Sequence, residues 1–140
     1  DPLISQLVNT IMRDGKKARA QRIVNDSLKY LAEKSSSDPY TVLSEVIETA
    51  SPLLKLTSNK KGSKVVHIPT PLRERQRRRR AIVWIIEAAA KRNDKTFAER
   101  FAAEVYDVSQ GTSTVLQKKM QLHKQALANR ANAQVSYNTQ

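Results

Sequence analysis

A run of arginines between residues 73 and 80 offers the clearest binding chemistry in this sequence. Six of these eight residues are Arg, and Glu74 is the single acid among them. The planar guanidinium group presents a fork of donors that matches two phosphate oxygens. From Lys55 to Arg80 the chain has ten Lys or Arg against one acid, so about nine of its twelve excess positive charges lie in 26 residues. This concentration predicts a phosphate-binding surface.

Such a run could instead form a solvated helix face or a nuclear localisation signal. A solvated face normally mixes charges of both signs, which this run does not. A detached localisation signal would not continue directly into the apolar segment 81–86. Phosphate binding is therefore the favoured interpretation, and its affinity should fall steeply as salt is added.

A helical projection divides the arginine run between faces. Arg73, Arg77 and Arg80 share one stripe opposite the apolar side, and we expect them to bind phosphate together. Arg75 belongs to the same run and is a further candidate. Arg78 and Arg79 extend the opposite and flanking faces, so we expect them either to contact a different nucleic-acid segment or to cover the neighbouring hairpin.

The hydrophobic period changes from helical to alternating just before this run. Alternating apolar residues on both sides of the turn 59–62 predict a β-hairpin at about residues 53–68, with Pro69 and Pro71 stopping the second strand. Its tip is basic through Lys60, Lys61 and Lys64. Lysines at such a tip either keep an exposed turn soluble or bind an anion. Beside the arginine run, binding is favoured.

Trp84 is the only tryptophan of the chain, and it falls within the polar stripe of the projected helix. It could pack against a neighbouring helix, or it could stack on a nucleotide or a phosphate-bound Arg. Periodicity leaves both roles open, and we include Trp84 among the candidate binding residues.

Elsewhere the sequence predicts helices. Apolar residues recur at helical spacing in 3–12, 20–31, 42–50, 82–89, 97–106 and, more weakly, 115–127. Asp38 before Pro39 is a predicted helix start. The expected fold is mainly α: a single-domain bundle of about six helices spanning 1–140, with one protruding hairpin between the third and fourth helices and a polar tail over 134–140.

Composition and motifs argue against several classes of protein. The chain has no cysteine, its two histidines lie 56 residues apart, and no apolar run approaches the roughly 18 residues of a membrane span. No glycine-rich phosphate loop or nucleophile elbow is present. We therefore expect no catalytic residues, metal site, cofactor or small-molecule substrate, and no membrane partner.

The net charge of +12 points to a polyanionic partner but does not choose between RNA and DNA. The sequence shows no helix-turn-helix with a polar recognition face, no zinc finger and no heptad zipper. A basic surface on a rigid helical body suits a folded RNA that is recognised by shape and phosphates. A DNA-compacting or regulatory nucleic-acid-binding protein is the alternative, and a basic membrane-surface adaptor is a third hypothesis.

Several strings in this order resemble the small-subunit ribosomal protein seven family. They include Asp14-Gly15-Lys16-Lys17, Trp84-Ile85-Ile86-Glu87-Ala88-Ala89, Lys91-Arg92-x-Asp94-Lys95, Gly111-Thr112 and Ala128-Asn129-Arg130-Ala131. The resemblance covers nearly the whole chain and agrees with the predicted order of helices and hairpin. It implies a non-enzymatic structural component of the small ribosomal subunit that binds the 3′ major domain of the rRNA and supports assembly of the head.

The resemblance also implies which residues face RNA and partners. The corner Lys16-Lys17, the hairpin tip and the start of the fourth helix would face rRNA, with Lys91, Arg92 and Lys95 as further candidates. The hairpin would approach the messenger RNA and the exit-site tRNA. The last helix, through His123, Lys124 and Arg130, would face other head and platform proteins and RNA.

Some features depart from the bacterial pattern of that family. The basic N-terminal arm is absent, the arginine run is dense, and the chain opens at Asp1 without Met, so we expect further residues upstream. These departures favour a mitochondrial member acting in the matrix, with a bacterial cytoplasmic or chloroplast origin as the alternatives.

Overall fold

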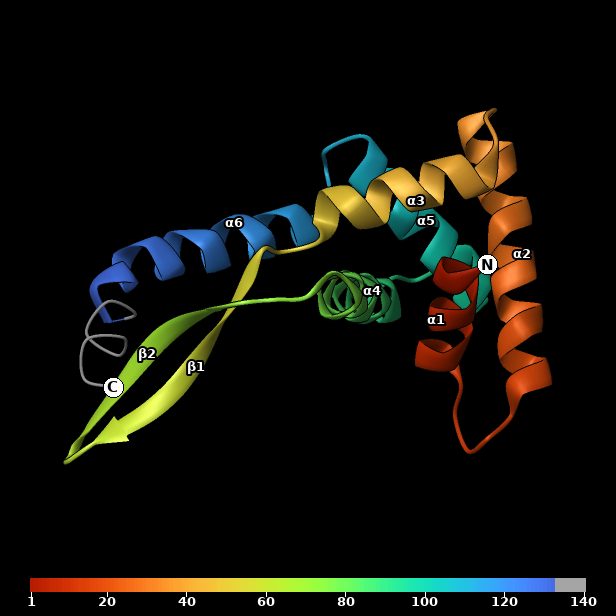
Figure 1. Cartoon of the computed structure of the whole chain (residues 1–140). Coiled ribbons are helices and arrows are strands. Elements are labelled where there is room, and N and C mark those ends of the chain that lie inside the picture. The colour runs from red at the N-terminus through yellow and green to blue at the C-terminus, as the bar shows by residue number, and fades with distance from the viewer. Residues whose placement is uncertain (133–140) are drawn as a thin grey trace.

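Six helices and one β-hairpin make up residues 1–132, the part of the chain that the computed structural model describes (Figure 1). The polar tail predicted for 134–140 lies outside the described residues. The mainly helical fold is confirmed, as is the hairpin between the third and fourth helices. In chain order the elements are α1 Pro2–Ile11, α2 Lys17–Ser35, α3 Pro39–Ala50, β1 Leu54–Lys61, β2 Lys64–Pro71, α4 Glu74–Ala90, α5 Phe97–Ser109 and α6 Thr114–Ala128.

Short polar side chains begin four of the helices by accepting a hydrogen bond from a free backbone N–H. Asp38 accepts from the Thr41 N–H at 3.2 Å, as predicted, and Pro39 follows it in the first turn of α3. At the start of α5 the Thr96 hydroxyl accepts a hydrogen bond from Glu99 N–H. The side chains of Asp1 and Ser113 begin α1 and α6 in the same way.

Removing the N-terminal cap of α3 should lower the stability of the protein by a small but measurable amount. We expect Asp38→Ala to lower the free energy of unfolding by about 1 kcal/mol, because Thr41 N–H loses its acceptor. Asp26→Ala is the matched control, since it removes the same charge from an exposed position inside α2. Urea unfolding of both variants is the measurement, and equal losses would contradict a capping role for Asp38.

The core lies where α5 meets the other helices, and α5 contacts α2, α3 and α4. Every residue from 101 to 105 is buried, which is more than one stripe of this helix. Phe101, Leu31 and Ile85 are among the largest fully buried side chains. The apolar periodicities at 3–12, 20–31, 42–50, 82–89 and 97–106 therefore correspond to the packed faces of α1 to α5.

The hairpin is longer at its base than the sequence predicts. Its strands pair antiparallel from Leu54 opposite Pro71 to Lys61 opposite Lys64, and the turn is Gly62-Ser63, with Gly62 at φ +63°. The expectation that the prolines end the second strand is wrong, since β2 continues through Pro71. Each strand of a two-stranded sheet has an open edge, so a proline nitrogen can face outward without breaking the ladder.

The hairpin and α6 extend together away from the body formed by α1, α2, α3 and α5, and α4 lies between the two parts (Figure 1). Contacts between α6 and β1, and a hydrogen bond of 3.0 Å from Asn132 Nδ2 to the His67 carbonyl, hold helix and hairpin side by side. None of the helices described is both long and apolar enough to cross a membrane.

Candidate nucleic-acid interface

The arginine run forms the first two turns of α4, and tertiary contacts sort its members into two groups. In the first turn of α4, the Gln76 side chain accepts a hydrogen bond from Arg73 N–H at 3.0 Å. Arg77 turns towards the end of α3, where its Nε donates to the Pro52 carbonyl at 3.1 Å and its Nη2 lies 3.5 Å from Glu48. Through these two contacts the Arg77 guanidinium is engaged by other residues of the protein.

Arg78 is also engaged by the protein. Its Nε donates to Gln6 Oε1 at 3.1 Å, and its Nη1 lies 3.1 Å from Glu74. Gln6 in turn donates through Nε2 to the Arg75 carbonyl at 2.9 Å. Arg78 therefore joins α4 to α1, and it does not cover the hairpin.

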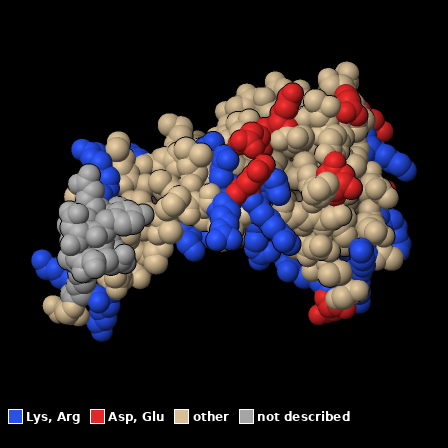
Figure 2. Space-filling model, in the orientation of Figure 1, with Lys and Arg blue, Asp and Glu red and all other residues tan. Residues whose placement is uncertain are grey.

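The remaining four arginines of the run, Arg73, Arg75, Arg79 and Arg80, are exposed, and we call them the outward arginines. Within residues 1–132, no ion pair joins any of them to an acid. Figure 2 shows Lys and Arg gathered over the region where Figure 1 places α4. The predicted stripe of Arg73, Arg77 and Arg80 is thus divided, because Arg77 faces α3.

The hairpin carries a second group of exposed cations. Lys55, Lys60 and Lys64 are exposed, and none of the ion pairs of the described chain includes them. Lys61 is the last residue of β1 and the register partner of Lys64. Basic side chains at the far end of the hairpin are visible in Figure 2. An exposed strand pair of this kind presents its charge well away from the helical body.

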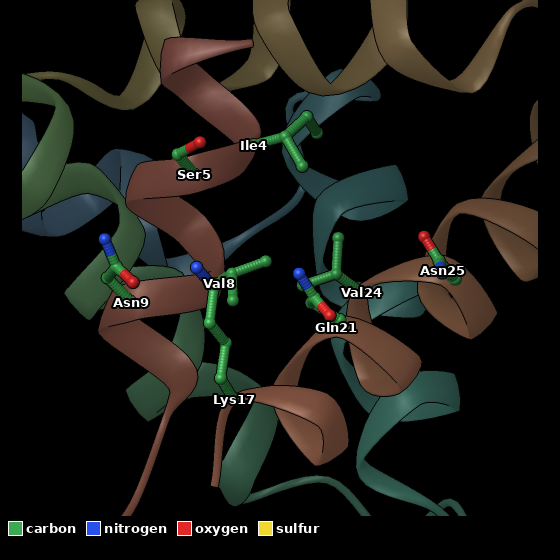
Figure 3. A pocket seen from close by; sticks show the side chains of 8 residues that line it. All are labelled: Ile4, Ser5, Val8, Asn9, Lys17, Gln21, Val24 and Asn25. Carbon is green, nitrogen blue, oxygen red and sulfur yellow. The ribbon is translucent and has the colours of Figure 1, made fainter. Parts of the chain in front are cut away.

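The corner between α1 and α2 holds Lys16 and Lys17, and both are exposed. Two successive residues with positive φ, Asp14 at +54° and Gly15 at +71°, reverse the chain just before them. Lys17 also lines a groove of about 420 Å³ between α1 and α2, shown in Figure 3. Amide side chains such as Asn9 and Gln21 make up much of its polar lining, so this groove carries less charge than the start of α4.

Three further candidates, one within α4 and two after it, have different surroundings. Lys91 and Lys95 are exposed, whereas Trp84 is half-buried and packs against the core. The helix-packing role left open for Trp84 is thus the one that its contacts support.

Arg92 is enclosed by acids. Its Nη1 lies 2.8 Å from both Glu104 and Asp107, and its Nε lies 3.4 Å from Asp94. The hydrogen bond that Arg92 donates to the Asp107 carboxylate raises the pKa of Arg92 above its ordinary value, and Glu104 acts in the same direction. Glu104 is buried and accepts a further hydrogen bond from Ser113 Oγ at 2.6 Å. This network joins the segment after α4 to α5 and to the start of α6, so the charge of Arg92 is compensated internally.

A cationic junction at the end of α3 was not predicted from the sequence. Lys119 donates through Nζ to the Thr49 carbonyl at 2.7 Å, and Arg77 contacts the nearby Pro52 carbonyl. His123 Nε2 accepts a hydrogen bond of 3.1 Å from Leu53 N–H at the base of the hairpin. Cations suit the carbonyl end of a helix, which carries partial negative charge. Only the tertiary fold brings α6 to this place.

This junction should make stability depend on pH. Burial, and then the charges of Lys119 and Arg77, lower the pKa of His123 below its ordinary value of 6.5. Below about pH 6.5 the unfolded chain therefore binds the proton more readily than the folded one, so stability falls as the pH falls through this window. Protonation would also remove the acceptor for Leu53 N–H.

We expect His123→Gln, which keeps a side-chain acceptor, to lack this component of the pH dependence. Urea unfolding of both proteins from about pH 7.5 to about pH 5 gives the difference in free energy of unfolding. The difference should shift in favour of the variant as the pH falls. A difference that stays constant over the whole range would rule out titration of His123.

Residues 1–132 contain no group of three or more side chains that could hold a metal ion.

The fold and the surface define a class of protein: a basic helical body with an extended hairpin and exposed cations at the start of one helix. A family model described as ribosomal protein S7p/S5e matches residues 1–130. The chain belongs to this family. Its relatives are ribosomal structural proteins and the family is not known to be enzymatic, in agreement with the expected class.

Individual relatives match nearly all of the chain. It is 42% identical over 135 residues to small ribosomal subunit protein uS7m of Schizosaccharomyces pombe, covering 96% of this chain but only 52% of that protein. It is 39% identical over 137 residues to uS7 of Pseudothermotoga lettingae, and the match covers 98% of this chain and 88% of that protein. It is 37% identical over 131 residues to uS7 of Acholeplasma laidlawii, and the match covers 94% of this chain and 84% of that protein. The chain thus spans about half of the Schizosaccharomyces pombe relative and most of the bacterial ones.

Proposed function

We propose that this chain is a structural constituent of the small ribosomal subunit and that it binds small-subunit rRNA through the outward arginines and the hairpin lysines. The observation that carries the proposal is the exposure of Arg73, Arg75, Arg79 and Arg80 without an acidic partner in residues 1–132. These four like charges at the start of one helix repel one another, and a bound anion would offset this repulsion. An rRNA backbone supplies that anion as a row of phosphates.

The finer part of the proposal concerns the place in the subunit. We assign the chain to the 3′ major domain and the head, with the hairpin near the messenger RNA and the exit-site tRNA. The projection of the hairpin from the helical body supports this assignment (Figure 1). Other head and platform proteins are the proposed protein partners. One core cluster with residues from all six helices supports a single rRNA-binding domain.

We further propose a mitochondrial ribosome as the place of action. The Schizosaccharomyces pombe relative, a mitochondrial protein, supports this proposal, whereas the bacterial relatives match over a similar length. The bacterial cytoplasm and the chloroplast are the alternatives.

Competition between RNA and DNA tests the proposed function. The purified chain is mixed with a labelled transcript of the 3′ major domain, and duplex DNA of the same length is added as the competitor at physiological salt. We expect the rRNA complex to survive an excess of DNA, because shape and phosphate spacing are recognised together. Equal displacement by DNA and by unlabelled rRNA would favour a general DNA-binding protein instead.

A further inference from the structure

A pocket beside the α1–α2 corner is distinct from the arginine run and the hairpin. It has a volume of about 340 Å³ and lies where the end of α1, the start of α2, the end of α4 and the start of α5 meet. We call it the corner pocket. Its floor is apolar, whereas cations stand around its rim.

The floor exposes apolar surface that the core does not fully cover. Met12, Ile23, Ile86 and Phe97 line the pocket, and all four are only half-buried although they pack against the core. Ala90, at the end of α4, is exposed on the same wall. A concave apolar site with an aromatic wall suits a flat ring better than a phosphate group alone.

The rim has the opposite character. Arg13, Lys16 and Arg19 line the pocket and are exposed, and none of the ion pairs within residues 1–132 involves them. Asp14 is the single acid in the lining. Three cations against one acid favour an anionic ligand. Because these cations surround an apolar floor, we expect a ligand whose anionic groups flank an apolar ring.

The backbone of the corner is fixed by its own hydrogen bonds. Lys16 N–H donates to the Arg13 carbonyl at 3.0 Å, and Lys17 N–H donates to the Gly15 carbonyl at 2.9 Å. Asp14 at φ +54° adopts the left-handed conformation, which Asp tolerates better than most residues with a side chain.

We propose that the corner pocket binds one unpaired nucleobase of the rRNA, while the phosphates on either side of that nucleotide contact Arg13, Lys16 and Arg19. A nucleotide joins a flat, largely apolar ring to a flanking charged backbone, which matches the floor and the rim together. This inference rests on the proposed function, and it adds a base-binding site to a surface otherwise built for phosphates.

Filling the pocket tests the proposal. Ala90→Trp should place an indole in the site with little effect on folding, because Ala90 is exposed. We expect the affinity for the 3′ major domain transcript to fall on the order of tenfold, as loss of one stacked base would cause. Thr49→Trp is the matched control at an exposed position of α3, and its affinity should stay close to that of the wild type.

A second measurement uses the unmodified protein and so does not depend on the variant folding. The transcript is prepared with 5-iodouridine and irradiated in the complex, and the crosslinked peptides are identified by mass spectrometry. Crosslinks to Met12 or Phe97 support the proposal. Crosslinks confined to other peptides, or wild-type affinity of folded Ala90→Trp, would overturn it.

The outcomes separate this inference from the proposed function. If the wild-type chain does not bind the transcript, the proposed function itself fails. If the wild type and Ala90→Trp bind equally, only the base-binding pocket is wrong. If Ala90→Trp keeps its rRNA affinity but no longer enters assembled subunits, the pocket holds a protein side chain and the proposal is likewise overturned.

Discussion

Replacing the four outward arginines by alanine should lower the affinity for small-subunit rRNA by roughly 100-fold or more. Each hydrogen bond to a phosphate that the variant cannot make is worth about 1 kcal/mol or more, and every 1.4 kcal/mol is a factor of ten in affinity. Filter binding of the 3′ major domain transcript by wild-type and variant protein at fixed salt measures the change.

Folding should be nearly unaffected by the same four substitutions. Arg73, Arg75, Arg79 and Arg80 are exposed and have no ion pair within residues 1–132, so the free energy of unfolding should change by about 0.5 kcal/mol or less. Arg77→Ala should behave differently, because its contacts with Pro52 and Glu48 would be lost. A large loss of stability in the quadruple variant would show that these arginines serve the fold.

A lower affinity could also follow from the loss of net charge alone, and a matched pair of variants separates the two causes. Arg79→Ala with Arg80→Ala removes two positive charges from α4. Lys29→Ala with Lys34→Ala removes two exposed charges from the second half of α2. Only the first pair should weaken rRNA binding strongly. Equal effects of the two pairs would mean that net charge, and not the start of α4, determines affinity.

The second large effect is expected at Glu104. This buried carboxylate receives Arg92 Nη1 at 2.8 Å and Ser113 Oγ at 2.6 Å. Glu104→Ala would leave the Ser113 hydroxyl without its acceptor and Arg92 with fewer charge partners. Breaking a buried ion pair by removing one member typically costs about 3–5 kcal/mol. In a chain of this length, the thermal midpoint should fall by roughly 10–20 °C.

Asp94→Ala provides the control for this prediction, because it removes another acid from the same arginine at a more exposed position. The Arg92–Asp94 distance is 3.4 Å, and the Asp94 side chain is 44% exposed against 6% for Glu104. The cost of Asp94→Ala should be below about 1 kcal/mol. Calorimetry of both variants decides the question, and similar midpoints would contradict a central role for Glu104.

The helices could be predicted from the sequence because their signals are local. The apolar stripe of α5 and the Asp38 cap of α3 depend on residues a few positions apart, and both are present in the structure. The hairpin was also predictable, but the continuation of its second strand through Pro69 and Pro71 was not. Pro69 normally argues against a strand, and only the open edge of a two-stranded sheet makes it acceptable.

The sorting of the arginines could not be predicted, because it depends on residues that are distant in sequence. Arg77 meets Pro52, 25 positions away, and Arg78 meets Gln6, 72 positions away. A helical projection assigns faces but does not show which face another helix covers. Arg92 presents the same difficulty, since its acidic partners Glu104 and Asp107 come from the following helix.

The central claim is that the outward arginines bind phosphates of small-subunit rRNA, and the salt dependence of binding tests it most directly. The logarithm of the affinity falls with the logarithm of salt by about 0.7–0.9 per phosphate contact. Loss of four contacts should therefore make the slope of the quadruple variant shallower than that of the wild type by about 3. Equal slopes for the two proteins would show that these four arginines do not contact the rRNA backbone.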